Sequence, residues 1–134
     1  MQQPELQLVQ LLSEEYMREN RFPTSDELRL IEYLAHKANY ALVLNWSKQL
    51  RVRPLTNNSI GSIEIINYAQ HENANTQYKE IANCMYYDND GVCVAVYLLV
   101  NQDNQICEID MWKGDDSPIR SIPESGKMED IAVL

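Results

Sequence analysis

Two carboxylates in the C-terminal half of the chain have a spacing that would let them act together. Glu108 and Asp110 are two residues apart in the alternating run Cys107–Trp112. Because successive side chains of a β-strand point to opposite faces, both carboxylates are expected on one face of a sheet. Such a pair could serve acid–base chemistry or bind a divalent cation, and a solvated sheet face would carry the same residues. Asp115 and Asp116 add two acids shortly beyond the pair.

The other residues that could do chemistry do not form a motif. His36 and His71 are far apart, and neither belongs to a His-Glu-x-x-His pattern. The three cysteines are odd in number and contain no Cys-x-x-Cys, so they predict reduced thiols rather than a disulfide or zinc framework. No basic residue adjoins Cys93 that would activate it as a nucleophile. The sequence therefore predicts no metal, no cofactor and no catalytic residue.

Helices are expected over about residues 4–50. Apolar residues at helical spacing predict a first helix from Pro4 to near Asn20. Thr24 followed by Glu27 is a capping box, which predicts the start of a second helix that runs to about residue 38. A third, shorter helix is predicted from Ala41 to about residue 50.

Strands are expected over about residues 51–113, because the apolar pattern changes to a period of two. The predicted strands cover 51–55, 60–66, 81–87, 92–100 and 105–112, with a polar loop between 67 and 77. Asp88-Asn89-Asp90-Gly91 predicts a tight turn, because these residues tolerate a positive φ. Residues 114–134 contain two prolines and two glycines, which predict an irregular tail.

The predicted fold is α+β, with the N-terminal helices on one face of a four- to five-stranded, mainly antiparallel sheet. The whole chain, residues 1–134, is expected to form one domain. The run from Val92 to Val100 is apolar on both faces, which predicts a central strand covered at least partly on both sides. Cys107, Ile109 and Met111 are expected on the valine face of the sheet. The residues expected on the opposite face are Ala82, Cys84, Tyr86, Cys93, Ala95, Tyr97, Glu108, Asp110 and Trp112. A slip of one residue would reverse this assignment.

The net charge of −9 is distributed unevenly. Residues 1–53 hold seven acidic and seven basic side chains, so the whole excess lies beyond residue 53. This charge disfavours nucleic acid and anionic membranes as partners and favours a basic protein, although it would also serve solubility alone. The start of the chain shows no signal peptide and no run reaches the length of a membrane helix, so a reducing cytoplasm is expected.

Several short motifs, taken in order, resemble a small family of uncharacterised bacterial domains. The resemblance would extend from about Arg21 to Ile122, and it implies a bacterial, cytoplasmic α+β domain without implying any catalytic residue. The motifs that carry it are Arg21-Phe22-Pro23-Thr24 with Glu27, Leu30-Ile31-Glu32-Tyr33-Leu34, Val52-Arg53-Pro54-Leu55, Gly61-Ser62, Asp90-Gly91-Val92, and Glu108-Ile109-Asp110-Met111-Trp112-Lys113 with Ser117-Pro118-Ile119.

These observations predict a non-enzymatic, acidic protein-binding module, most concretely an immunity-type protein that occludes a basic toxin. Aromatic rings would supply buried area and carboxylates would steer the partner. The predicted partner-binding residues are Tyr86, Tyr97, Glu108, Asp110, Trp112, Asp115 and Asp116. The alternatives are a tail that folds back over this face, a small metal-dependent or carboxylate-based hydrolase, and a structural protein that self-associates through an edge strand.

Overall fold

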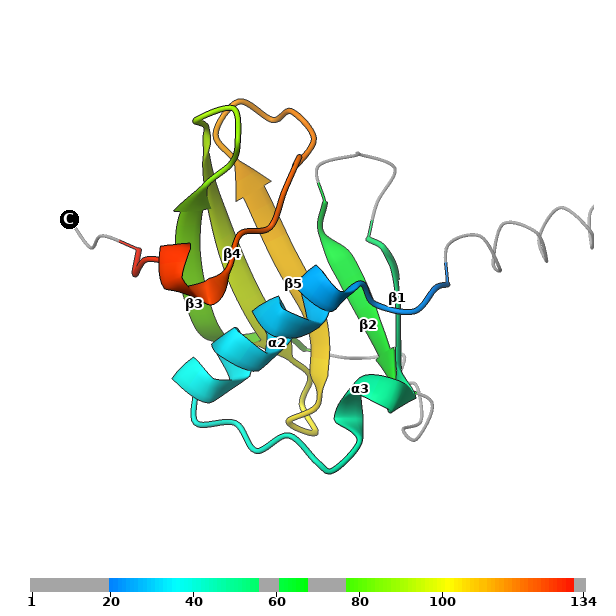
Figure 1. Ribbon diagram of the computed structural model, residues 1–134. Coiled ribbons are helices and arrows are strands. Elements are labelled where there is room, and N and C mark those ends of the chain that lie inside the picture. The colour runs from blue at the N-terminus through cyan, green and yellow to red at the C-terminus, as the bar shows by residue number, and fades with distance from the viewer. Residues whose placement is uncertain (1–19, 56–60, 68–76, 132–134) are drawn as a thin grey trace, which may run out of the picture.

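The structure, a computed structural model, describes residues 20–55, 61–67 and 77–131. Five antiparallel strands form an open sheet in the order β1-β2-β5-β4-β3, and helix α2 lies across one face of it (Figure 1). The predicted α+β class and antiparallel sheet are confirmed. The elements are α2 (Ser25–Lys37), α3 (Trp46–Gln49), β1 (Leu50–Pro54), β2 (Ile63–Asn67), β3 (Lys79–Tyr87), β4 (Cys93–Val100), β5 (Ile106–Lys113) and the 3-10 turn η1 (Ser125–Lys127). The helix predicted before Asn20, and His71, lie outside the described residues.

Helix α2 begins at the predicted capping box. The Glu27 amide donates to the Thr24 hydroxyl at 3.1 Å, and the Thr24 amide donates to the Glu27 carboxylate at 2.8 Å. Arg21 adds two hydrogen bonds to the same carboxylate, at 2.7 and 2.9 Å. The apolar stripe of the helix is buried against the sheet through Leu30, Ile31, Leu34 and Ala35.

The predicted third helix is wrong in its extent, because α3 has only four residues. Asn39 and Asn45 adopt positive φ values of 54° and 63°, in the left-handed region, which interrupts a regular helix on both sides of residues 40–44. Leu42 and Trp46 still pack against the core, whereas Leu44 is exposed. No helix in the described part of the chain is long and apolar enough to cross a membrane.

The core lies between α2 and one face of the sheet. This face carries Val94, Val96 and Leu98 of β4, an interior strand between β5 and β3, with Ile109 and Met111 beside them, as predicted. The expectation for β3 is wrong. Ala82, Cys84 and Tyr86 lie opposite Leu98, Val96 and Val94 and are buried in the core, because residues directly opposite one another in an antiparallel pair share a face.

Cys107 is also not where the alternation predicts it. A β-bulge falls between the pairs Leu99↔Glu108 and Val100↔Ile106, so Cys107 is the extra residue. Ile106 takes the core position instead, and the Cys107 thiol approaches the Leu99 carbonyl at 3.5 Å. Glu108, Asp110 and Trp112 lie beyond the bulge and on the face that the sequence predicts.

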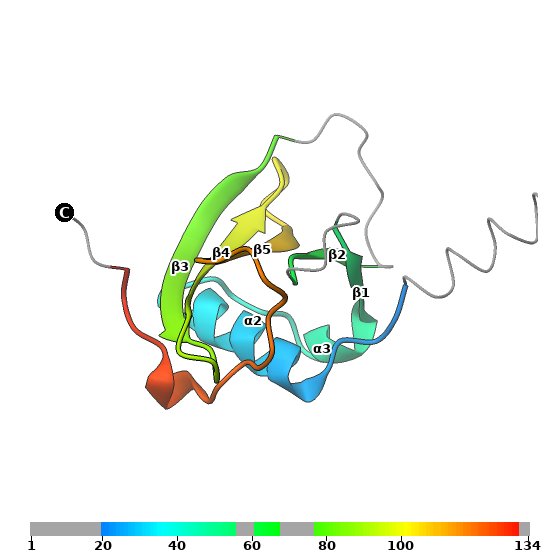
Figure 2. The same cartoon turned by 90° about the horizontal axis from the view of Figure 1, so that it is seen from above.

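The C-terminal segment runs along the α2 side of the sheet, as Figures 1 and 2 show from two directions. Its residues Ile119, Ile122 and Met128 pack against the core, and the backbone of Glu129 pairs with that of Met85 through two hydrogen bonds of 2.8 Å. Residues 114–131 therefore do not fold back over the opposite face, which had been the alternative to an open surface.

A buried carboxylate anchors this segment. Asp88, which is 3% exposed, accepts five hydrogen bonds: from the amides of Asn89, Arg120 and Ser121, the Ser121 hydroxyl and the Lys113 ammonium. Lys113 also donates to Asp90 at 2.6 Å and to the Pro118 carbonyl at 3.1 Å. Burial alone would raise the pKa of Asp88, but the hydrogen bonds from Arg120, Lys113 and Ser121 outweigh it and hold that pKa well below its usual range.

The substitution Asp88→Asn is expected to lower the free energy of unfolding by about 3–5 kcal/mol, because it leaves a buried ammonium without one of its carboxylates. Urea unfolding measures this change, and hydrogen exchange is expected to rise at the amides of Arg120 and Ser121. Asp103→Asn is the matched control, since Asp103 is exposed in the β4–β5 turn. If the two variants unfold at the same urea concentration, Asp88 is not the anchor.

Candidate functional site

The face of the sheet opposite α2 is the candidate site, and we call it the outer face. It combines side chains from all five strands, because the register brings alternate residues of each strand to the same side. Neither α2 nor residues 114–131 pack on it. Its residues are Arg51 and Arg53 of β1, Glu64 and Ile66 of β2, Glu80, Asn83, Met85 and Tyr87 of β3, Cys93, Ala95, Tyr97 and Leu99 of β4, and Glu108, Asp110 and Trp112 of β5.

Four of the seven predicted residues meet on this face. Tyr97 is directly opposite Asp110, and Glu108 and Trp112 flank Asp110 along β5. Tyr97 is half-buried, and the Trp112 ring is 59% exposed.

The other three predicted residues lie elsewhere. The Tyr86 side chain is in the core, where its hydroxyl donates to the Ser121 carbonyl at 2.8 Å and burial raises its pKa. A buried ring cannot contact a partner, so the prediction for Tyr86 is wrong in placement. Asp115 and Asp116 are exposed in the turn that follows β5. Hydrogen bonds from the Ser117 hydroxyl and amide lower the pKa of Asp115.

Three carboxylates of β2 and β5 lie close together on the outer face, and their surroundings differ. Glu64 forms an ion pair with Arg53 at 2.9 Å. Asp110 accepts hydrogen bonds at 3.0 Å from the Ser62 hydroxyl and from the Trp112 indole N–H. Glu108 is the most buried of the three, with 7% exposure, and no described residue donates a hydrogen bond to its carboxylate.

The surroundings of Glu108 disfavour a negative charge on its carboxylate. Burial, followed by the negative charges of Asp110 and Glu64, raises the pKa of its carboxyl group. Glu64 lies directly opposite it in the β2–β5 ladder, and like charges at such positions destabilise a sheet. The outer face therefore holds an anionic site that a cation would neutralise.

Sequence reasoning missed Glu64 and Tyr87 as members of this face. Glu64 could have been found, because it stands between Ile63 and Ile65 and must point away from them. Tyr87 could not, because its face depends on the register across the Asp88–Val92 turn. Its ring is 60% exposed.

Two of the three described thiols, those of Cys84 and Cys107, do not suggest a nucleophile. Burial raises the pKa of Cys84 to about 11, and burial together with Glu108 raises that of Cys107 to about 12. Such thiols remain protonated and unreactive near neutral pH. Among the residues that the structure describes, no group of three or more His, Cys, Asp or Glu side chains is placed to hold a metal ion.

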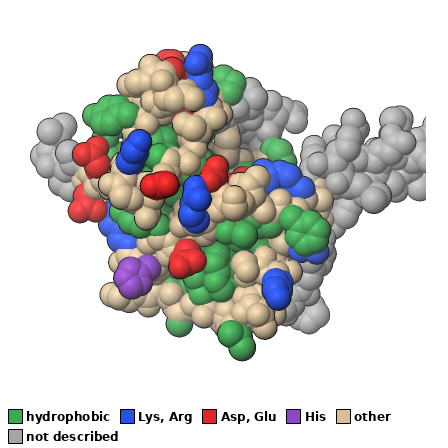
Figure 3. All heavy atoms as spheres, viewed as in Figure 1, with side chains coloured by type: hydrophobic (Ala, Val, Ile, Leu, Met, Phe, Trp, Pro, Cys, Tyr) green, Lys and Arg blue, Asp and Glu red, His purple; other side chains and the backbone are tan. Residues whose placement is uncertain are grey.

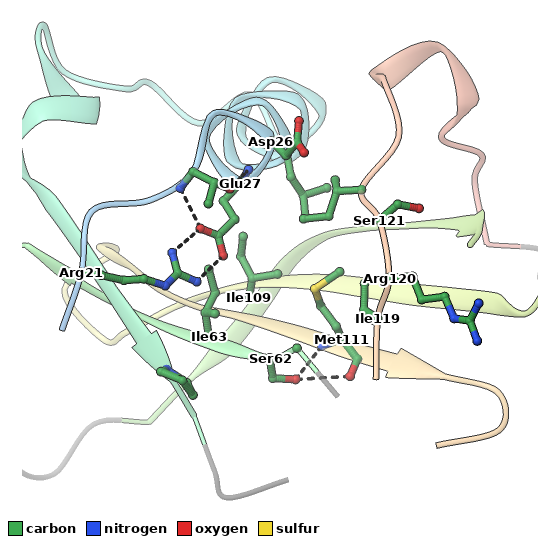
Figure 4. A pocket seen from close by; sticks show the side chains of 15 residues that line it. Arg21, Asp26, Glu27, Ser62, Ile63, Ile109, Met111, Ile119, Arg120 and Ser121 are labelled. Carbon is green, nitrogen blue, oxygen red and sulfur yellow. Dashed lines mark hydrogen bonds and ion pairs between the residues drawn. The ribbon is translucent and has the colours of Figure 1, made fainter. Parts of the chain in front are cut away.

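A cavity of about 350 Å³ on the other side of the sheet is the second candidate (Figure 4). Its polar lining includes the Arg21–Glu27 ion pair, whose carboxylate is already used by Arg21 and by the Thr24 amide. The other polar residues of the lining are Thr24, Asp26, Ser62, Arg120 and Ser121. Figure 4 shows the Arg120 side chain pointing away from that pair. Arg21, Thr24 and Glu27 thus stabilise the start of α2, and the Ser62 hydroxyl is used by Asp110 and by the Met111 backbone. The apolar lining is Leu30, Pro54, Ile63, Ile109, Met111, Ile119 and Ile122.

The α2 side of the molecule carries a mixed surface. Figure 3 shows acidic and basic side chains interspersed there, with small apolar areas between them. Such a pattern is typical of an ordinary solvated surface. The outer face combines exposed aromatic rings with unbalanced carboxylates, and it is therefore the stronger candidate.

The fold and this face define a small α+β domain with a one-sided core. Residues 20–123 match the family described as a domain of unknown function, DUF6984, and the chain belongs to this family. The matched range is nearly the span over which the sequence motifs resemble a family of uncharacterised domains. No curated protein and no solved structure matches the chain.

The substitution Glu108→Gln is expected to stabilise the protein at pH 7 by up to about 1 kcal/mol, because it removes one of two like charges directly opposite each other. The folded-state pKa of Glu108 is raised, so the native state binds the proton more tightly than the unfolded state does. The destabilisation by Glu108 is thus absent below the unfolded pKa and develops as the pH rises through the folded pKa.

Thermal unfolding at a series of pH values tests this expectation. The Glu108→Gln variant should unfold at a higher temperature than the natural protein at pH 7, and the gap should close in acid. Glu32→Gln, a change of the same kind on the exposed surface of α2, should show no such gap. A Glu108→Gln variant that unfolds earlier at pH 7 would mean that the carboxylate has a stabilising partner.

Proposed function

We propose that the protein is a non-enzymatic binding module whose outer face receives a basic protein. One observation carries the proposal. The exposed Trp112 ring and the nearly buried Glu108 carboxylate lie on the same face of β5. Exposed aromatic rings supply the area that anchors an interface. Carboxylates that lack a cation supply complementarity to a basic surface.

The charge of the chain supports a basic partner. With a net charge of −9, the protein would attract a cationic surface over a distance and speed the encounter. The fixed indole of Trp112, held by its N–H bond to Asp110, loses little freedom on binding. Asp115 and Asp116 lie just beyond β5 and extend the acidic surface at that end.

In its most specific form, the proposal describes an immunity-type inhibitor. The outer face would cover the cationic rim of a basic toxin and block access to its active site. The protein would act by occlusion, so none of its residues would need catalytic chemistry. The free thiols Cys84, Cys93 and Cys107 suit a reducing cytoplasm as the place of encounter.

A basic dodecapeptide of alternating lysine and serine with an arginine at each end is a defined probe for this face. The double variant Glu108→Gln/Asp110→Asn is expected to bind it at least about tenfold more weakly at 50 mM salt, because two interface charges are lost. Fluorescence anisotropy of a labelled peptide measures the affinity. Circular dichroism verifies that both variants are folded.

The matched control is Glu32→Gln/Glu124→Gln, which removes the same charge from exposed positions on the α2 side. It should bind the peptide within about twofold of the natural protein. Equal weakening by the two double variants would show that only net charge matters. That result, or peptide-induced amide shifts confined to α2, would contradict the proposed interface.

A further inference from the structure

Glu64, Asp110 and Glu108 on the outer face differ in the cations and hydrogen-bond donors that the chain provides for them. Glu64 has the guanidinium of Arg53, and Asp110 has two neutral donors, Ser62 and Trp112. Glu108 has no donor among the described residues. The residue is 7% exposed, and its carboxylate oxygens keep some contact with solvent. A carboxylate that is largely removed from water and lies opposite a like charge costs stability, and a cation bound beside it would reduce that cost.

The side chains of β5 on this face have a regular spacing. Glu108, Asp110 and Trp112 follow one another on one face of β5 at intervals of roughly 7 Å, which is twice the rise per residue of a strand. The indole N–H bond to Asp110 fixes the ring beside the carboxylates. Anionic oxygens and an exposed aromatic ring are thus held side by side on a rigid strand.

We propose that the outer face is built to receive an arginine side chain of the partner, with its guanidinium group between Glu108 and Asp110 and against the indole of Trp112. This inference rests on the proposed function and names the anchoring group of the same interface. The cation would supply the donors that Glu108 lacks. It would also relieve the repulsion between Glu108 and Glu64.

Arginine fits this arrangement better than lysine does. The guanidinium group is planar, presents five N–H donors in a fixed fork, and stacks on aromatic rings. It can therefore donate to two carboxylates in one plane while contacting the Trp112 ring. An ammonium group is a strongly hydrated point charge, and it would gain less from the same site.

The experiment compares two peptides of equal charge, blocked hexa-arginine and blocked hexalysine. The full chain is used in a Trp46→Phe background, which leaves Trp112 as the one tryptophan of the two in the sequence. Titration of the Trp112 fluorescence should give an affinity at least about fivefold higher for hexa-arginine. Circular dichroism verifies the fold of the Trp46→Phe protein.

Two further variants locate the preference. Glu108→Gln should bring the ratio of the two affinities close to one, and its fold is expected to be stable. Glu80→Gln is the control, because Glu80 lies on the same face at the β3 edge of the sheet, two strands from Glu108. It should leave the preference for arginine intact.

The outcomes separate this inference from the proposed function. If both peptides change the Trp112 fluorescence with equal affinity, the face binds basic chains but the arginine site is wrong. If Glu80→Gln removes the preference as fully as Glu108→Gln does, the site is also wrong. If neither peptide changes the fluorescence, both the arginine site and the proposed function are overturned.

Discussion

The carboxylate of Asp88 determines which face of the sheet the C-terminal segment covers. It accepts hydrogen bonds from Lys113 at the end of β5 and from the backbone of Arg120 and Ser121. Buried charges are costly unless they are paired and hydrogen-bonded, so this arrangement is strongly favoured over one that separates these groups. That arrangement places Ile119, Ile122 and Met128 beside α2. The aromatic and acidic side chains of β5 lie on the other face.

The two faces of the sheet place different kinds of side chain on the same strand. On β5, Ile109 and Met111 are buried beneath α2, while Glu108, Asp110 and Trp112 project from the opposite side. The core face supplies the apolar burial that stabilises the fold. The outer face carries a cross-strand pair of like charges, which costs stability. A cost of this kind supports the proposal that this face binds a partner, because function and stability often place opposing demands on the same residues.

Local sequence signals predicted much of this architecture. The Thr24–Glu27 capping box marked the start of α2 to the residue, and the period of two located all five strands to within a few residues. The shared face of Glu108, Asp110 and Trp112 followed from the same period. These features depend on contacts between residues close in the chain, which a single sequence displays directly.

The features that were not predicted depend on distant residues. The face of Tyr86 and Tyr87 follows from the register across the Asp88–Val92 turn, and the position of Cys107 follows from a bulge opposite Leu99. The side taken by the C-terminal segment depends on Asp88, whose partners Lys113 and Ser121 are 25 and 33 residues away. Neither register nor such long-range pairing leaves a periodic signal in the sequence.

The most direct test of this account is the quenching of Trp112 fluorescence in the Trp46→Phe protein by caesium and by iodide at equal ionic strength. Both ions reach an exposed ring, but a ring beside uncompensated carboxylates attracts the cation and repels the anion. The account predicts that caesium quenches Trp112 more efficiently than iodide, and that Glu108→Gln/Asp110→Asn reduces this difference. Equal quenching by both ions, or quenching by neither, would contradict an exposed indole in an anionic site.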